Sequence, residues 1–330
     1  MLVVGDLHFD YPVRYSAGGG NIYFSAVRDV LRYVVVEVAE EGESVVFLGD
    51  IFERKDRILN RVKNSLIEVL EEGMDKGLSY WFVVGNHDVG EGGEVSVRFL
   101  SWIGRVVDEV GVYEIEGTRV LFLPWVSGKI RVGECDLVLG HFRVQGGRAG
   151  EFIDSGEECY KVSDFRNVRG WIVDGHYHDR QVVDDRICVV GSVVSVRFGE
   201  RNDKYVVRVS GGGLEWISLP RVLDREVVYV RSIDSVDERL VGKVVRFDVE
   251  IGKVDTVELV KRIEEVRPLW WELNFVRREV GDELEKLREV QEEGSVIEGL
   301  DGYVRGRLER EVLDVVDREV WLKLWEEVNR

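Results

Sequence analysis

The chain has 330 residues, of which 63 are acidic and 45 are basic, so its formal net charge is −18. Such a charge argues against a general nucleic-acid-binding protein, because phosphate binding gains from counterions released at basic surfaces; any such contact needs a local basic patch, bound metal ions or a partner. No apolar run approaches the roughly 18 residues of a membrane span, while 45% hydrophobic residues suffice for a buried core.

The first half of the chain alternates apolar strands with amphipathic helices. Strands are predicted at 2–4, 45–48 and 80–84, and helices at 23–40 and 60–76, the second with Asn60 as candidate N-cap. This order predicts βαβ units and a parallel sheet. Ligands of such sheets bind beyond the carboxyl ends of the strands.

The second half of this region is richer in strands, with short turns between them. They are predicted at 119–123, 136–139, 171–173, 187–190, 205–209 and 214–218. These strands suggest a second sheet packed on the first, giving a sandwich with outer helices. Residues 143–170 are long, glycine-rich and polar, which is typical of a functional loop.

Pro220 and Arg221 mark a predicted domain boundary. Beyond it, strands at 243–249 and 271–277 flank a helix at 254–266, the pattern of a small α/β domain. The remaining residues, 279–330, are charged and helical, with an apolar stripe that includes Trp321, Leu324 and Trp325. This stripe either packs on its own domain or docks a partner, since tryptophans are common interface anchors.

The N-terminal residues and the cysteines indicate the cellular compartment in which we expect the protein. The first apolar run is broken by Asp6 and lacks a basic leader, so we expect a strand there rather than a signal peptide. Cys135, Cys159 and Cys188 are odd in number and lack CxxC spacing, which favours core-filling residues over a disulfide framework or zinc knot. A reducing cytoplasm is therefore expected.

All five histidines of the chain lie where predicted strands end. They accompany carboxylates and one amide in the segments Asp6-x-His8, Gly49-Asp50, Gly85-Asn86-His87-Asp88, Gly140-His141 and Gly175-His176-Tyr177-His178. Two divalent ions about 3.5–4 Å apart can clamp the attacking and leaving oxygens of an in-line phosphoryl displacement. The ordered set therefore predicts a two-metal hydrolase.

Such a site needs a bridging carboxylate, for which Asp50 is the candidate. The other predicted ligands fall into two sets: Asp6, His8 and His178 for one ion, and Asn86, His141 and His176 for the other. Imidazoles and carboxylates without thiolates suit Mn, Fe or Zn better than Mg or Ca. Bridging two cations lowers the pKa of a water, so a hydroxide nucleophile is expected near neutral pH. His87, which is not needed as a ligand, is expected to stabilise the pentavalent phosphorus or to protonate the leaving oxygen.

At these residues the sequence resembles the calcineurin-like metallophosphoesterase superfamily, whose signature is the same ordered set. The flanking segments Gly140-His141-Phe142 through Gly146, Asp174 through His178, and Gly191-Ser192 through Phe198-Gly199-Glu200 to Lys204 resemble its DNA-repair nuclease branch. That branch contains bacterial SbcD, the meiotic-recombination-eleven nucleases and the tailed-phage recombination nucleases. The compact length and these motif forms look closest to the phage type, and the resemblance covers about residues 1–210.

The resemblance implies an α/β fold in three parts. These are a two-sheet metallophosphoesterase sandwich flanked by helices at 1–221, a small α/β DNA-capping domain at 222–278 and a C-terminal helical ATPase-binding segment at 279–330. It also implies ligand sets of Asp6, His8, Asp50 and His178 for one ion and Asp50, Asn86, His141 and His176 for the other, with His87 acting on the transition state.

The activity implied is that of a manganese-dependent 3′–5′ DNA exonuclease and single-strand endonuclease. It would act as a homodimer with an SbcC-type SMC-like ATPase in double-strand-break repair and recombination, in the cytoplasm, or in the host cytoplasm if phage-encoded. The helices at 23–40 and 60–76 are the candidate dimer surfaces.

The sequence departs from the family pattern next to the bridging ligand. The superfamily often places an aspartate three residues after that ligand to orient the catalytic histidine, and here Glu53 is expected to hold His87 in its working tautomer. The basic residues that follow are Arg54, Lys55, Arg57, Arg61 and Lys63, with Asp56 the single acid among them. This cluster either grips the DNA backbone or forms a solvated helix start.

Two other functions share these motifs. A phosphatase or small-molecule phosphodiesterase would use the same dinuclear site, but the extension at 222–330 argues against it because a small substrate needs no such addition. A catalytically silent scaffold is disfavoured because no motif residue is missing.

Overall fold

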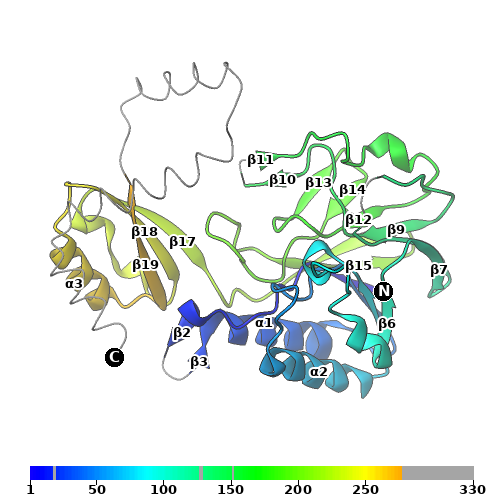
Figure 1. The fold of residues 1–330 in the computed structure, drawn as a ribbon, viewed down its shortest axis with the longest axis horizontal. Helices are drawn as coiled ribbons and strands as arrows, with labels where there is room; N and C mark the ends of the chain where they lie inside the picture. The colour runs from blue at the N-terminus through cyan, green and yellow to red at the C-terminus, as the bar shows by residue number, and fades with distance from the viewer. Residues whose placement is uncertain (18–19, 126–128, 151, 277–330) are drawn as a thin grey trace. The chain divides into compact units, whose positions relative to one another are not determined.

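The computed structural model describes residues 1–17, 20–125, 129–150 and 152–276. They form two six-stranded sheets followed by a three-stranded sheet (Figure 1). The predicted C-terminal segment at 279–330, with Trp321, Leu324 and Trp325, lies outside the described residues. None of the helices in the described ranges is long and apolar enough to cross a membrane.

The first sheet has the strand order β16-β15-β1-β4-β5-β6. Its parallel strands are β1 (Leu2–Val4), β4 (Ser44–Phe47), β5 (Ser79–Val83) and β6 (Gly104–Val107). Strand β15 (Tyr205–Ser210) runs antiparallel to β1 and pairs with β16 (Gly213–Ser218). The prediction that β15 and β16 belong to the second sheet is therefore wrong. Strand β1 is buried throughout, so the backbone groups along its second edge require a neighbouring strand.

The second sheet has the strand order β13-β14-β12-β9-β8-β7. Its strands are β7 (Gly111–Ile115), β8 (Thr118–Leu123), β9 (Leu137–Gly140), β12 (Ile172–Asp174), β13 (Gln181–Val183) and β14 (Ile187–Val189). The central four strands are parallel, and the edge strands β7 and β13 are antiparallel. Strands β6, β7 and β13 were not predicted, because short, partly exposed strands carry little apolar signal.

Successive residues of the central strands enter different cores, because strand side chains alternate between faces. Leu2 and Val45 face the helices α1 (Ile22–Tyr33) and α2 (Asn60–Met74), whereas Val3 and Val46 face the second sheet. Helix α1 continues as a π-helix at Val34–Val38. The predicted α/β sandwich is confirmed.

The structure shows where the predicted outer helices pack, and it corrects one predicted helix cap. Both α1 and α2 pack on the first sheet, whereas the outer face of the second sheet packs against Phe142, Tyr160 and Phe165 of the segment 141–168, which follows β9. Asn60 is the first residue of α2 rather than its N-cap, which is Leu59. Helix α1 does have a side-chain cap, because Asn21 Oδ1 accepts a hydrogen bond from Phe24 N at 2.9 Å.

The third sheet consists of the parallel strands β17 (Arg225–Val230), β18 (Val244–Glu250) and β19 (Trp270–Val276). Helix α3 (Thr256–Val266) joins β18 to β19 and packs on the sheet through Leu259 and Ile263. The two predicted strands and the helix lie near their expected positions, and β17 is additional. The division into domains at residue 221 stays a prediction.

Short elements complete the described chain. Two hairpins pair β2 (Ser16–Ala17) with β3 (Gly20–Asn21), and β10 (Arg148–Ala149) with β11 (Phe152–Ile153). The 3-10 turns are Val13–Tyr15, Asn86–Asp88, Arg98–Trp102, Val162–Phe165, Ile233–Ser235 and Glu238–Leu240. One of them, Asn86–Asp88, carries part of the predicted site.

Candidate metal centre

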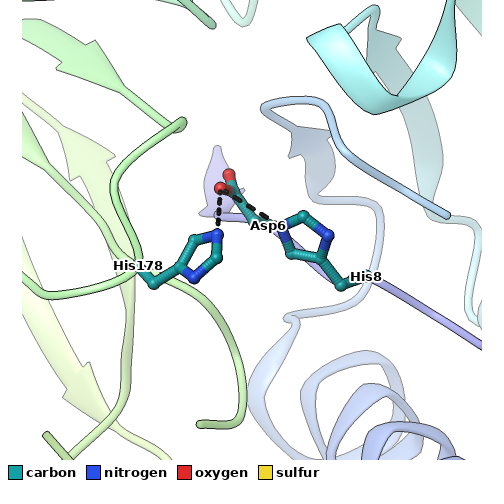
Figure 2. A group of neighbouring side chains, drawn as sticks. All are labelled: Asp6, His8 and His178. Carbon is teal, nitrogen blue, oxygen red and sulfur yellow. Dashed lines mark ion pairs between the residues drawn. The ribbon is translucent and has the colours of Figure 1, made fainter. Parts of the chain in front are cut away.

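The predicted site residues all follow the carboxyl ends of parallel strands. Asp6 and His8 follow β1, Asp50 follows β4, Asn86 and His87 follow β5, His141 follows β9, and His176 and His178 follow β12. Strands of both sheets therefore deliver side chains to one place. Figure 2 shows three of them, with Asp6 between His8 and His178.

The first cluster consists of Asp6, His8 and His178, with Asp50 beside them. His8 Nε2 lies 3.9 Å from Asp6 Oδ2 and 3.7 Å from Asp50 Oδ2, and His178 Nε2 lies 4.0 Å from Asp6 Oδ2. Ligand atoms at about 2.1 Å from one ion lie about 3–4 Å from each other. These separations therefore suit one shared cation.

The second cluster consists of Asp50, Asn86, His141 and His176. His141 Nε2 lies 3.5 Å from Asp50 Oδ2 and 2.9 Å from Asn86 Oδ1. His176 Nδ1 lies 3.0 Å from the same Asn86 oxygen. Asp50 Oδ2 faces both clusters, so it occupies the position that a bridging ligand requires.

Three histidine rings, those of His141, His178 and His8, have an oxygen atom next to Nδ1 on the side away from the clusters, so that Nε2 faces the clusters. His141 Nδ1 donates to the Leu48 carbonyl at 2.8 Å, and His178 Nδ1 lies 2.7 Å from Glu200 Oε1. His8 Nδ1 lies 2.6 Å from Glu53 Oε2. With Nδ1 of His141 and His178 hydrogen-bonded, Nε2 of these rings is left to bind an ion, the arrangement found around protein-bound metals.

The residues present fit divalent ions. Asp6 Oδ2 and His8 Nε2 are buried and form no hydrogen bond within the described part of the chain, which is costly unless another partner binds them. Burial and the neighbouring His141 lower the pKa of His176 to about 3, and burial lowers the pKa of His141 and His178. These three imidazoles are therefore held in the neutral form that binds metals.

Three of the predicted ligands have left-handed backbone conformations. The φ angles are 46° at His8, 48° at Asp50 and 68° at His176. A non-glycine residue in this region costs on the order of 1–3 kcal/mol, and such strain is concentrated at functional sites. The preceding Gly49 is also required, because a Cβ there would lie 2.7 Å from His141 Nδ1.

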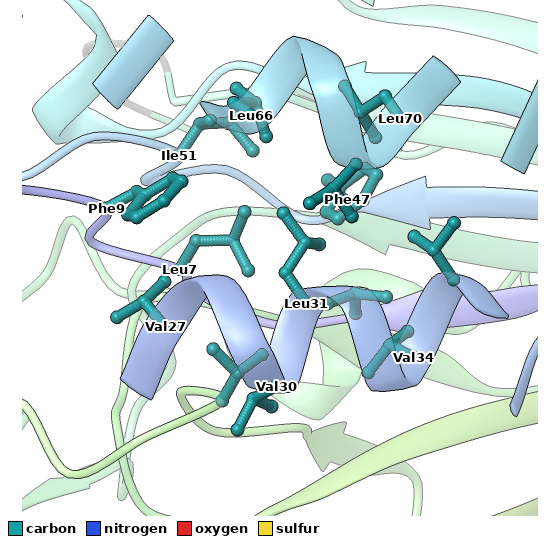
Figure 3. Close-up of a cluster of buried hydrophobic side chains, with 14 of the residues drawn as sticks. Leu7, Phe9, Val27, Val30, Leu31, Val34, Phe47, Ile51, Leu66 and Leu70 are labelled. Carbon is teal, nitrogen blue, oxygen red and sulfur yellow. The ribbon is translucent and has the colours of Figure 1, made fainter. Parts of the chain in front are cut away.

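Apolar residues that alternate with the predicted ligands hold these loops in the core. Leu7 and Phe9 flank His8, and Ile51 follows Asp50; all three apolar side chains are buried. Figure 3 shows them with residues of α1 and α2 in the core between the first sheet and these two helices. The alternation turns the polar side chains away from this core, which fixes the direction in which the predicted ligands point.

His87 is held differently from the prediction. Its Nδ1 donates to the backbone carbonyl of Glu53 at 2.9 Å, and the Glu53 carboxylate is 3.8 Å away. The longer side chain of glutamate instead brings that carboxylate to His8. These three residues form a further cluster that could hold an ion; in the described chain His8 Nδ1 and Glu53 Oε2 form no hydrogen bond, whereas His87 Nδ1 bonds the Glu53 carbonyl. The His87 side chain is 23% exposed and its Nε2 is free of this contact.

Glu200 and Asp88 support the site, although the sequence analysis gave them no role. Glu200 holds His178 and also accepts hydrogen bonds from the Val196 and Arg197 backbone. Asp88 accepts from Ile51 N at 3.1 Å and from Gly85 N at 2.9 Å, so it ties the loops after β4 and β5 together. Both residues lie in quoted motifs, but Asp88 bonds backbone groups and Glu200 reaches a histidine 22 residues away, and neither contact has a local sequence signature.

The predicted DNA-binding residues lie between the end of β4 and the first turn of α2. Arg54 forms an ion pair with Asp10 at 3.0 Å, while Lys55 and Arg57 are exposed. Arg61 lies over the Tyr11 ring and Lys63 over the Phe99 ring. Their role in DNA binding stays a prediction.

Replacing Glu200 with glutamine should weaken Mn²⁺ binding by about 10–100-fold, the usual effect of losing an outer partner of a metal-binding histidine. Burial opposes ionisation of Glu200, but the hydrogen bond from His178 outweighs it and lowers its pKa to about 2. The carboxylate is therefore charged where it orients the ring. Titration calorimetry with Mn²⁺ measures the effect. Glu72→Gln, which breaks an exposed ion pair with Arg32, is the control; equal affinity in both variants would count against this role.

Mn²⁺ affinity should rise with pH. In the metal-free protein, burial opposes protonation of His8, but Glu53 and Asp50 outweigh it and raise its pKa to about 9. Burial and the charge of Asp50 also raise the pKa of Asp6 well above its usual range. Each proton displaced by an ion should increase affinity by about tenfold per pH unit. Calorimetry in buffers of different ionisation enthalpy should detect proton release on binding; a pH-independent affinity would refute the expectation.

The site thus has the ligands of a metal-dependent hydrolase, and comparison with protein families agrees. Residues 1–208 match the family model described as calcineurin-like phosphoesterase, so the chain belongs to the calcineurin-like phosphoesterase family. It is a hydrolase with candidate clusters for divalent metals.

Two solved structures are similar to this chain at low sequence identity. A protein of unknown function, AQ665 from Aquifex aeolicus, is 17% identical with a TM-score of 0.30, over 53% of this chain and 89% of that one. Nuclease MPE from Pseudomonas putida is 14% identical with a TM-score of 0.33, over 65% and 86% of the two chains. The comparison with curated proteins returned no match.

Proposed function

We propose that this protein is a manganese-dependent DNA nuclease with 3′–5′ exonuclease and single-strand endonuclease activity. The observation that carries a phosphodiesterase function is the position of Asp50 Oδ2, which faces both ligand clusters. The choice of DNA is supported by the likeness of the segments around His141 and His176 to the DNA-repair nuclease branch.

The side chains of the site would have separate roles in such a reaction. Asp6, His8, Asp50 and His178 would hold one ion, and Asp50, Asn86, His141 and His176 the other. When bound, the two ions would neutralise charge on the phosphoryl group and supply a nucleophile at neutral pH. His87 keeps its Nδ1–H on the Glu53 carbonyl, so its Nε2 is the atom available to the phosphoryl or leaving oxygen.

The partners are part of the same proposal. The protein would act as a homodimer with an SbcC-type SMC-like ATPase in DNA double-strand-break repair and recombination, in the cytoplasm. Residues 279–330 would bind the ATPase, residues 222–278 would cap the DNA, and α1 and α2 are the candidate dimer surfaces. The motif resemblance supports this assignment.

The test compares two substrates for the full chain. End-labelled single- and double-stranded DNA should be shortened from the 3′ end with Mn²⁺ and remain intact with EDTA. Bis(p-nitrophenyl) phosphate, a generic diester, reports the metal site independently of DNA. If the diester is hydrolysed while DNA remains intact, even with the ATPase added, the protein is a small-molecule phosphodiesterase and the proposal fails.

A further inference from the structure

A pocket of about 550 Å³ opens beside the candidate metal centre. Its lining includes Arg14, Tyr15, Tyr23, Glu53, Arg54 and Arg197. The carboxylate of Glu53 contacts His8 in the first ligand cluster, so the pocket and the metal centre share a wall. The volume lies in the range of about 300–1000 Å³ that is usual for small-ligand sites.

Two of the pocket arginines form no ion pair within the described chain. Arg54 is paired with Asp10, and Glu53 is engaged by His8. Arg14 and Arg197 are exposed, and neither forms an ion pair with a carboxylate among the described residues. The pocket therefore offers two free guanidinium groups, which are well suited to phosphate oxygens.

A further arginine, Arg225, lies behind Tyr15 of the pocket lining. Arg225 is only 4% exposed; it donates from Nη1 to the Tyr15 hydroxyl at 2.6 Å and from Nε to the Ser195 carbonyl at 2.7 Å. Its Nη2 has no hydrogen-bond partner in the described chain, and no carboxylate pairs with it there. A buried cation without a counter-charge favours an anion nearby.

The loop that carries Arg14 is fixed in place before any ligand binds. Trp270 Nε1 donates to the Arg14 carbonyl at 2.7 Å, and the Trp270 ring packs edge-on against Tyr15 at 4.8 Å between centroids. The Arg14 guanidinium lies over the Tyr15 ring, 4.8 Å from its centroid. Such preorganisation lowers the entropy cost of binding.

We propose that this pocket binds the nucleotide adjacent to the scissile phosphate, with its own phosphate on Arg14 and Arg197. The inference rests on the proposed nuclease function and adds a substrate class, an unpaired DNA strand. The volume of this pocket suits a single nucleotide, so we expect the end of a duplex to fray before cleavage.

The test measures binding of the full chain to a fluorescein-labelled oligothymidylate in EDTA, by anisotropy over a range of salt concentrations. Each phosphate contact contributes about 0.7 to the slope of log K against log salt for a single strand. The double variant Arg14→Gln/Arg197→Gln should reduce the slope by about that amount, because both side chains contact the same phosphate, and each single variant should reduce it by part of that amount. Arg169→Gln should leave it unchanged, because Arg169 precedes β12 and lies at the opposite edge of the sheet.

A second readout separates this inference from the proposed function. With Mn²⁺, each pocket variant should raise KM for the oligonucleotide by at least about tenfold more than KM for bis(p-nitrophenyl) phosphate, which has no neighbouring phosphate. If wild type degrades DNA while both variants match Arg169→Gln in slope and KM, the pocket inference is overturned. If wild type neither binds nor cleaves the oligonucleotide, even with the ATPase added, the nuclease function itself fails.

Discussion

Asp50→Asn is expected to lower the rate of DNA hydrolysis by at least about 1000-fold, equivalent to about 4 kcal/mol of transition-state stabilisation. Asp50 is the carboxylate that faces both ligand clusters, so removing its charge weakens both ion sites at once. Steady-state hydrolysis of labelled DNA with Mn²⁺ measures the loss. The same variant should lose most of the rise in melting temperature that Mn²⁺ gives the wild type.

The Asp50→Asn substitution is expected to leave the fold intact. Asparagine fills the same volume, and its amide oxygen can still accept the hydrogen bond that Asp50 Oδ1 receives from His87 N at 2.8 Å. Circular dichroism of the metal-free variant should therefore match the wild type. A folded variant that keeps both its activity and its response to Mn²⁺ would exclude Asp50 as a bridging ligand.

His87→Ala should lower kcat for DNA by about 10²–10⁴-fold, the usual contribution of a general acid or base. Mn²⁺ affinity should stay unchanged, because the Nδ1 of His87 is bound to the Glu53 carbonyl and the two ligand clusters are complete without this ring. Calorimetry with Mn²⁺ and turnover of labelled DNA together check this pair of outcomes. A loss of metal binding equal to that of Asp50→Asn would make His87 a ligand instead.

The leaving group decides between the two roles considered for His87. The p-nitrophenolate of bis(p-nitrophenyl) phosphate leaves without a proton, whereas a sugar hydroxyl needs one. If His87 protonates the leaving oxygen, His87→Ala should cost much less on this diester than on DNA. Equal losses on both substrates would assign the ring to stabilisation of phosphoryl charge.

The ligand clusters could be predicted because their members directly follow apolar runs. Asp50 comes after a buried strand, and parallel strands end at a common edge, so local sequence places these side chains together. The supporting contacts could not be predicted in the same way. His141 and His87 are oriented by the carbonyls of Leu48 and Glu53, and every residue has a carbonyl.

Long-range strand pairing was the other limit of the sequence analysis. Strand β15 is as apolar as the strands of the second sheet, and only its pairing with β1, Leu2 opposite Arg208, assigns it to the first. A strand pattern specifies which face is buried but not which neighbour it has. The sandwich was therefore predictable, whereas the membership of its sheets was not.

The distance along the chain between the predicted ligands has a consequence for synthesis. The first cluster joins Asp6 to His178, and the second joins Asn86 to His176. A nascent or truncated chain that ends before β12 lacks a ligand of each ion. Both ligand clusters therefore need the chain through His178, so a fragment that ends before β12 should lack metal-dependent hydrolase activity.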